Sequence, residues 1–203
     1  MSTRISGTEG YAEEARFLVE RWKNISFESQ HQIVLDLIPT VTSKVLDIGS
    51  GIGTDAAAFF AMGHQVVAVE PTEELRTPGI ELHMEYGIEW LDDSLPDLSI
   101  LRARKEAFDV IMLTAVWMHL DEVQRCRAMP VIASLLSAAG IIIMSLRHGP
   151  VPNGRRMFEV TAAETIELAA LQGLQLVLNI RTQSVSIENR IAGVSWTRLA
   201  FRR

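Results

Sequence analysis

The chain has 203 residues, 48% hydrophobic and 22% charged, a composition that fits one globular domain with a sizeable core. Its single cysteine, Cys126, excludes an internal disulfide, and its net charge of −6 argues against general nucleic-acid binding. The first residues contain no apolar stretch of the export-signal type, so we expect a cytoplasmic protein.

The charges are distributed unevenly along the chain. Residues 1–100 carry 17 acids and 6 bases, a net charge of −11, whereas residues 101–203 carry 8 acids and 13 bases, a net charge of +5. A basic half can mark a polyanion-binding region. The two halves can equally interleave in one fold, and both interpretations stay open here.

Two helices are predicted before residue 40. Apolar side chains recur at helical spacing in residues 9–22, and residues 26–38 begin at a candidate N-cap, Ser26 or Ser29, and end before Pro39. The aromatic side chains that we expect in the core are Phe17, Trp22 and Phe27.

Beyond residue 40, short β-branched or apolar runs alternate with helical stretches. The runs predicted as strands are residues 44–49, 65–70, 108–114 and 140–146. The helical segments between them are residues 55–63, a weaker one at 73–87 that Pro78 interrupts, and 119–140. Alternation of this kind predicts a mostly parallel sheet with helices on both faces.

Nineteen consecutive residues, 128–146, carry no charge, which is nearly the length of a membrane span. Pro130 and Gly140 interrupt this stretch. We therefore interpret it as an amphipathic helix, broken or kinked at Pro130, followed from Gly140 by a strand buried on both faces. No association with a membrane is expected.

The C-terminal part begins with a helix over residues 161–173, where Thr161 and Glu164 form a capping-box pattern. Residues 174–183 and 194–201 follow as two strands with a turn around 188–193. The predicted fold class is α/β, a Rossmann-like, doubly wound, mostly parallel sheet with an antiparallel edge strand and an N-terminal helical extension. We expect a single domain over 1–203, comprising a helical cap (1–40), a cofactor-binding core (41–146), and a substrate loop with the C-terminal part of the sheet (147–203).

The densest functional signal is the glycine-rich loop after the first strand. Gly49, Gly51 and Gly53 let a ligand approach the backbone closely, and the following helix exposes N–H groups. Dinucleotide binding asks for a third glycine at position 54, where this chain has Thr54, which disfavours a nicotinamide-dependent oxidoreductase. The carboxylate of Asp47 instead favours a cationic ligand.

Glu70 ends the second strand, where a carboxylate accepts both hydroxyls of a ribose. The expected ligand is therefore an adenosine-like nucleoside with a cationic chain and no pyrophosphate. S-adenosylmethionine has these parts.

The sequence resembles the class I S-adenosylmethionine-dependent methyltransferases. VLDIGSGIG (45–53) is similar to their first motif, and Glu70 matches the acid that ends their second strand. FDVIMLTAVWMHL (108–120) and LLSAAGIIIMS (135–145) are similar to their fourth-strand and fifth-strand segments. The resemblance implies methyl transfer from S-adenosyl-L-methionine, with S-adenosyl-L-homocysteine as product, to an O or N atom of a small molecule.

The resemblance also implies which residues surround the cofactor. Asp92 is the preferred adenine contact, although another register places Leu91 there. Asp92 and Asp93 can also be solvated loop acids, and Trp117 can be core filler. The residues implied around the cofactor are Tyr11, Asp47, Gly49, Gly51, Gly53, Glu70, Leu91, Asp92, Asp93, Thr114 and Trp117.

The loop after the fifth strand is the candidate substrate loop. Arg147, Arg155 and Arg156 suit an anionic small molecule, because guanidinium groups bind carboxylate or phosphate through forked hydrogen bonds. His148 and His119 are candidate bases, since methyl transfer needs a base only when the acceptor arrives protonated. The alternatives are a solvated loop, arginines paired with the acidic half, and a His119 that only caps a helix.

Other chemistries find less support. Thr114-Ala115-Val116-Trp117 differs from the motif of nucleic-acid amino-methyltransferases, and Cys126 lacks the context of a cytosine-methylating nucleophile, so we expect it to pack as a small apolar residue. The cysteine and histidine residues are not spaced as the ligands of a zinc or iron–sulfur site, so we expect no metal. A non-catalytic S-adenosylmethionine-binding module that serves a protein partner stays an alternative, and a homo-oligomer stays open.

Overall fold

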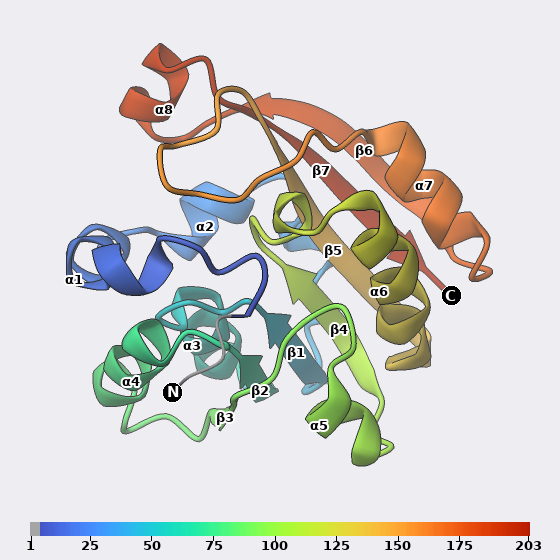
Figure 1. The fold of residues 1–203 in the computed structure, drawn as a ribbon. Coiled ribbons are helices and arrows are strands. Elements are labelled where there is room, and N and C mark those ends of the chain that lie inside the picture. The colour runs from blue at the N-terminus through green and yellow to red at the C-terminus, as the bar shows by residue number, and fades with distance from the viewer. Residues whose placement is uncertain (1–4) are drawn as a thin grey trace.

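The computed structural model describes residues 5–203; the first four residues of the stretch searched for an export signal lie outside this part. Seven strands form one sheet in the order β3-β2-β1-β4-β5-β7-β6 (Figure 1). Strands β1 to β5 run parallel, whereas β7 is antiparallel to both of its neighbours. The strands are β1 (Lys44–Ile48), β2 (Gln65–Val69), β3 (Glu89–Leu91), β4 (Phe108–Leu113), β5 (Leu136–His148), β6 (Gln175–Gln183) and β7 (Ser195–Arg202).

Helices cover both faces of the sheet, as the alternation of elements predicts. Buried side chains of α5, α6 and α7 pack on one face, and those of α2 and α3 pack on the other. Helix α1 packs against α4 near the ends of β1 and β2 (Figure 1). The helices are α1 (Tyr11–Trp22), α2 (Phe27–His31), α3 (Thr54–Ala61), α4 (Glu73–Leu82), α5 (Ser99–Ala103), α6 (Glu122–Ser134), α7 (Ala162–Ala170) and α8 (Ile187–Ile191).

The N-terminal region is helical, but its second helix is shorter than predicted. Ser26 caps α2 by accepting a hydrogen bond from the backbone N–H of Ser29, and a separate 3₁₀ turn, Leu35–Leu37, replaces the expected continuation. Phe27 is buried, whereas Phe17 is 63% exposed, so the prediction that Phe17 packs in the core is wrong. Phe17 instead lies at the rim of the cavity described below.

The uncharged stretch divides between a helix and a strand, but the boundary lies earlier than predicted. Helix α6 continues through Pro130 and ends at Ser134, and β5 already begins at Leu136. Pro130 is tolerated because it and Cys126, whose carbonyl loses its helical partner, are both exposed and water can bond that carbonyl. Cys126 is therefore not packed as predicted. Within residues 5–203, no helix combines the length and apolarity of a membrane span.

The C-terminal strands form an antiparallel pair, but the antiparallel strand β7 lies between β5 and the edge strand β6. The expected turn between β6 and β7 contains the short helix α8. Thr161 caps α7 as predicted, whereas the Glu164 side chain binds Arg125 instead of completing a capping box.

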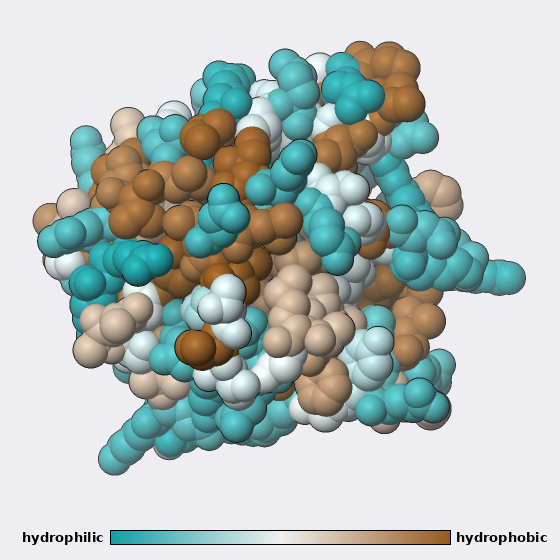
Figure 2. Space-filling view, turned by 180° about the vertical axis from the view of Figure 1, so that it is seen from behind, coloured by the Kyte–Doolittle hydropathy of each residue, from teal (hydrophilic) through white to brown (hydrophobic). Residues whose placement is uncertain are grey.

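Part of the sheet retains apolar surface. Leu176, Val177 and Ile180 of the edge strand β6 are each about two-fifths exposed. Seen from behind, hydrophobic surface gathers on the side where β6 and β7 lie (Figure 2). An exposed apolar edge strand is a feature that proteins usually cover or blunt, so the expectation of an oligomer or protein partner stays open.

Candidate functional site

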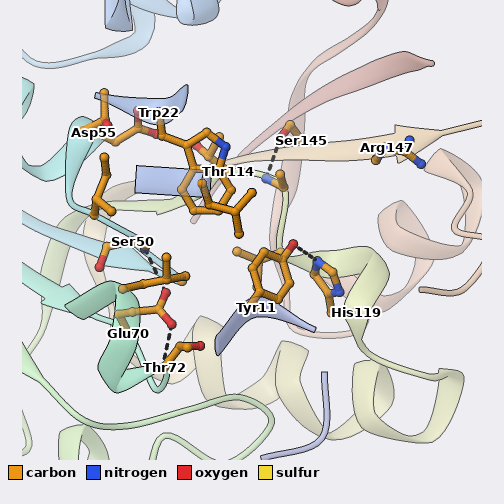
Figure 3. A pocket seen from close by; sticks show the side chains of 18 of the residues that line it. Tyr11, Trp22, Ser50, Asp55, Glu70, Thr72, Thr114, His119, Ser145 and Arg147 are labelled. Carbon is orange, nitrogen blue, oxygen red and sulfur yellow. Dashed lines mark hydrogen bonds between the residues drawn. The ribbon is translucent and has the colours of Figure 1, made fainter. Parts of the chain in front are cut away.

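A cavity of about 810 Å³ opens at the carboxyl ends of the parallel strands (Figure 3). Ligands of open α/β sheets bind in this position because the strand-to-helix loops converge there. The walls come from the loops after β1, β2, β3 and β4, from α1, and from residues of β5, β7 and the β6–β7 connection. Residues far apart in the sequence, such as Tyr11, Glu70 and Arg147, therefore face one space (Figure 3).

The glycine-rich loop after β1 forms one wall. Gly49 and Gly51 line the cavity with φ angles of 69° and 58°, which favour glycine. A Cβ atom on Gly49 would lie 2.5 Å from Cγ2 of Val116. Gly53 also has a positive φ but does not line the cavity; a Cβ there would lie 2.6 Å from the Trp90 ring, so this glycine permits packing at the start of α3.

Asp47 brings a buried carboxylate to the cavity. The residue is 1% exposed, and its Oδ2 atom has no hydrogen-bond partner within the described chain. Burial, together with the carboxylates of Asp55 and Glu70, raises the pKa of Asp47 well above its ordinary value, although a backbone hydrogen bond from Ala56 acts in the opposite direction. A cationic ligand group would satisfy Oδ2 and favour the ionised carboxylate.

Glu70 follows β2 and is held firmly at the cavity. Its two carboxylate oxygens accept backbone hydrogen bonds from Gly51 and Thr72, each 2.8 Å long. Burial raises the pKa of Glu70, although these amide bonds oppose the shift. The amides fix the orientation of the carboxylate and leave further lone pairs for hydroxyl donors.

The loop after β3 places the predicted adenine contacts differently. Asp92 is exposed, forms an ion pair with Arg76 and does not line the cavity; buried Leu91 does not line it either. Asp93 lines the cavity, and its oxygens accept backbone hydrogen bonds from Ser94 and Leu101. Only Asp93 of this pair lines the cavity, because the exposed Asp92 side chain is turned to Arg76.

A buried polar cluster lies behind the glycine-rich loop, and only Thr114 was predicted from the sequence. The Thr114 hydroxyl donates to Oδ2 of Asp55 over 2.6 Å, and Nε2 of His31 lies 3.0 Å from both oxygens of Asp55. Burial by itself raises the pKa of Asp55, but His31 and the hydrogen bonds hold it below its ordinary value. Asp55 lies two residues after the glycine motif, and this position was the available sequence signal.

Tyr11 and His119 meet across the cavity (Figure 3). Nδ1 of His119 lies 2.9 Å from the carbonyl oxygen of Arg156, which can only accept, so Nδ1 carries the proton. Burial lowers the pKa of His119, although that hydrogen bond opposes the shift, so Nε2 of the neutral ring accepts from the Tyr11 hydroxyl 3.0 Å away. Burial raises the pKa of Tyr11 to about 12.

Two other predicted site residues lie outside the cavity. Trp117 is fully buried in the core, which matches the core-filler alternative. His148 follows Arg147 on β5, and neighbouring residues of a strand point to opposite faces. Arg147 therefore lines the cavity while Nε2 of His148 lies 2.8 Å from the hydroxyl of Thr197.

The three predicted substrate arginines have different environments. Arg147 and Arg155 line the cavity; Arg155 forms an ion pair with Glu14, and its guanidinium lies 4.2 Å from the centroid of the Tyr11 ring. Arg156 does not line the cavity, because it binds Asp121 and the carbonyl oxygen of His119. Arg155 and Arg156 thus support the alternative of arginines engaged by acidic partners, although only Glu14 comes from the acidic half.

Sequence reasoning missed two cavity residues on β7, Trp196 and Arg198. Their place depends on the antiparallel register, in which Arg198 lies opposite Ser145 and Trp196 lies opposite Arg147. A strand pairing between residues fifty positions apart has no local sequence signal. The alternation of side chains along each strand then directs all four residues to one face.

This chain is similar to known methyltransferases in both sequence and fold. Residues 46–144 match the model of a methyltransferase domain family. No curated protein matches the sequence.

Solved structures of methyltransferases share the fold. The 1,6-didemethyltoxoflavin-N1-methyltransferase of Burkholderia thailandensis, solved with 1,6-didemethyltoxoflavin and S-adenosylhomocysteine, has a TM-score of 0.74 at 20% identity, covering 95% of this chain and 85% of that one. Magnesium protoporphyrin IX methyltransferase of Synechocystis, with bound S-adenosylmethionine, has a TM-score of 0.71 at 15% identity, covering 100% of this chain and 99% of that one. The N-methyltransferase NodS of Bradyrhizobium japonicum, with S-adenosylhomocysteine, has a TM-score of 0.67 at 15% identity, covering 94% of this chain and 98% of that one.

Proposed function

We propose that this chain is a class I S-adenosylmethionine-dependent methyltransferase, that its cavity binds S-adenosylmethionine, and that it methylates an oxygen or nitrogen atom of an anionic small molecule. The observation that carries the cofactor assignment is the buried carboxylate of Asp47: the residue lines the cavity, and its Oδ2 atom lacks a partner in the described structure. An uncompensated buried carboxylate is costly, and a ligand ammonium group removes that cost.

The other cavity residues fit the remaining parts of the cofactor. Gly49 and Gly51 leave room for a ligand against the backbone, since a side chain at either position would project toward neighbouring residues. Glu70 has the fixed orientation and free lone pairs to accept ribose hydroxyls. We assign the adenine contact to Asp93 in place of Asp92, because only Asp93 lines the cavity.

The chain's residues position the reactants and exclude water. When bound, S-adenosylmethionine supplies a sulfonium-linked methyl group for in-line displacement by the acceptor. Alignment and desolvation provide most of the acceleration in such a reaction. The buried walls formed by Ile52, Leu75 and Met118 supply the dry surroundings.

An acceptor that arrives protonated needs a proton acceptor, and the Tyr11–His119 pair can provide it. The Tyr11 oxygen accepts the acceptor's proton while the Tyr11 hydroxyl proton passes to Nε2 of His119 along their hydrogen bond. His119 is suited to this because burial keeps it neutral at physiological pH. His148 is not retained as a base, since it does not line the cavity.

The anionic character of the acceptor is inferred from the arginines of the cavity. Arg147 and Arg155 line the cavity, and Nη1 of Arg155 is buried without a hydrogen-bond partner in the described residues. A buried guanidinium nitrogen favours an oxygen acceptor. Arg156 is assigned a structural role through its contacts with Asp121.

Calorimetric titration tests the cofactor assignment. We expect the protein to bind S-adenosylhomocysteine and not NADH, and Glu70→Ala to weaken that binding by about tenfold or more, since it removes a charged hydrogen-bond acceptor. Glu106→Ala, which removes a partly buried carboxylate that pairs with Lys44 and does not line the cavity, is the matched control and should bind normally. Preference for NADH, or unchanged affinity of Glu70→Ala, would overturn the assignment. A screen for S-adenosylhomocysteine release then separates an enzyme from a non-catalytic binding module.

A further inference from the structure

Strands β5 and β7 form a polar and aromatic wall on the acceptor side of the cavity. Ser145 and Arg147 lie two residues apart on β5, so their side chains share a face. The register pairs Ser145 with Arg198 and Arg147 with Trp196. All four residues line the cavity, and we call them the β5–β7 wall. They belong to other strands than the glycine-rich loop and Glu70, which follow β1 and β2 and which we assign to the cofactor.

Arg198 is the unusual member of this wall. The residue is only 8% exposed, and burial lowers the pKa of its guanidinium, although the Asp55 carboxylate opposes that shift. Among the described residues, its hydrogen bond goes from Nη2 to the backbone carbonyl oxygen of Gln30, 3.0 Å away. A buried guanidinium has five N–H donors, so this environment leaves donor capacity facing the cavity.

The charges around the wall leave room for a single anionic group. Four arginines line the cavity, namely Arg21, Arg147, Arg155 and Arg198. Glu188 forms an ion pair with Arg21, and carboxylates also offset Arg155 and Arg198. Glu14 forms an ion pair with Arg155, and Asp55 interacts electrostatically with Arg198. One uncompensated positive charge suits a monoanion, whereas a dianion beside Asp55 would be repelled.

The wall also offers a flat apolar surface. The Trp196 ring lines the cavity with its centroid 5.7 Å from Cζ of Arg198. Met157 and the exposed Phe17 line the same cavity. Aromatic and thioether side chains bind planar rings through stacking and dispersion contacts.

We propose that the β5–β7 wall binds a planar aromatic monocarboxylate, whose ring contacts Trp196 and whose carboxylate binds Arg198 and Arg147; Arg198 supplies the buried donors, and Arg147 supplies the positive charge that no carboxylate offsets. This acceptor class deepens the proposed methyltransferase function and rests on it. Arg198 and Trp196 are then determinants of acceptor specificity. The fork of the guanidinium matches the two oxygens of a carboxylate, which explains why an arginine occupies this buried position.

Titration of the protein saturated with S-adenosylhomocysteine tests the wall. Benzoate is the probe, and benzamide is its neutral analogue of nearly equal shape. We expect benzoate to bind at least about tenfold more tightly than benzamide, since only benzoate forms a charge-assisted pair. In NMR spectra of protein labelled with ¹⁵N-tryptophan, benzoate should shift the indole resonance of Trp196. The resonance of Trp90, which does not line the cavity, should stay unchanged. Equal binding of the two probes, or no shift at Trp196, would overturn the proposal.

Substitutions then identify the anchor. Arg198→Gln should weaken benzoate binding by about tenfold or more while the affinity for S-adenosylhomocysteine stays unchanged. Arg181→Gln, on the exposed face of neighbouring β6, is the matched control and should behave as wild type. Benzoate affinity that Arg198→Gln leaves unchanged would refute the assignment.

Three further measurements distinguish a folding defect, a phosphate site and a failure of the proposed function from loss of the carboxylate site. If Arg198→Gln does not fold, Arg198→Lys retains the charge without the fork and should still weaken benzoate binding. Phenyl phosphate that binds tenfold more tightly than benzoate would overturn the carboxylate assignment. Failure of S-adenosylhomocysteine to bind would contradict the proposed function instead, and the benzoate–benzamide comparison without it would still decide whether the wall is an anion site.

Discussion

Replacing Asp47 with asparagine should make the protein more stable and at the same time weaken its binding of S-adenosylmethionine. The carboxylate is 1% exposed, and its Oδ2 lacks a partner within residues 5–203. An asparagine keeps the side-chain shape and an acceptor for the Ala56 amide, but it removes the buried charge. The loss of a charged hydrogen bond to the ligand ammonium costs about 1.5–3 kcal/mol, which raises Kd roughly 10- to 150-fold.

The stability gain has a pH dependence whose sign follows from linkage. The pKa of Asp47 is raised in the folded protein, so between about 3.9, its unfolded value, and its folded value the folded state holds more protons than the unfolded state. The free energy of unfolding therefore falls as pH rises through this window, and the wild type carries the full penalty above it. The substitution removes this penalty.

Thermal unfolding with and without S-adenosylhomocysteine measures both effects. At pH 7 without ligand, Asp47→Asn should melt higher than the wild type, by about 2–4 °C for each kcal/mol of relieved destabilisation. The difference should shrink as pH falls toward about 4. Asp97→Asn, on an exposed carboxylate paired with Arg127, is the control and should change neither Tm nor affinity. An unchanged or lower Tm together with unchanged affinity would refute the reasoning.

Three further predictions follow from the geometry of the site. Calorimetry should show that Asp93→Asn weakens S-adenosylhomocysteine binding several-fold while Asp92→Asn does not, because only Asp93 lines the cavity; equal effects would contradict the reassignment. Gly49→Ala should lower the free energy of unfolding in urea by about 1–3 kcal/mol, and more than Gly63→Ala, which has a positive φ but open space around it. Because burial lowers the pKa of His119, the unfolded state binds more protons below about pH 6.5, and stability falls on acidification. His119→Asn should reduce that loss between pH 7.5 and 5.5, and an unreduced loss would count against a buried neutral imidazole.

Much of the fold could be predicted because its signals are local. The run from Lys44 to Ile48 is buried on both faces, and the parallel strands of this core read as continuous apolar segments. Helix α6 shows the limit of local rules: Pro130 predicts a break, but its exposed position lets water bond the orphan carbonyl and the helix continues. Whether a position is exposed depends on tertiary packing, which the sequence states only indirectly.

The candidate site likewise contains residues that could be predicted from local sequence and residues that could not. Asp47 is the last but one residue of β1 and Glu70 directly follows β2, so their place at the carboxyl edge follows from local pattern. Asp92 and Asp93 are neighbours of the same chemistry, and only the direction of each side chain decides which one lines the cavity. Arg198 could not be found from local sequence, because its place depends on the β5–β7 register.

Charges from the two halves of the chain meet in this cavity. Arg155 in the basic half forms an ion pair with Glu14 in the acidic half, and Arg198 interacts electrostatically with Asp55 of the acidic half without forming an ion pair. The halves therefore interleave, and their charges do not simply cancel. The end of the cavity formed by the first strands is acidic through Asp47 and Glu70, whereas the end formed by β5 and β7 is basic. A cavity with this polarity favours a cationic donor at one end and an anionic acceptor at the other, which orients the two reactants before any contact specific to their shape is made.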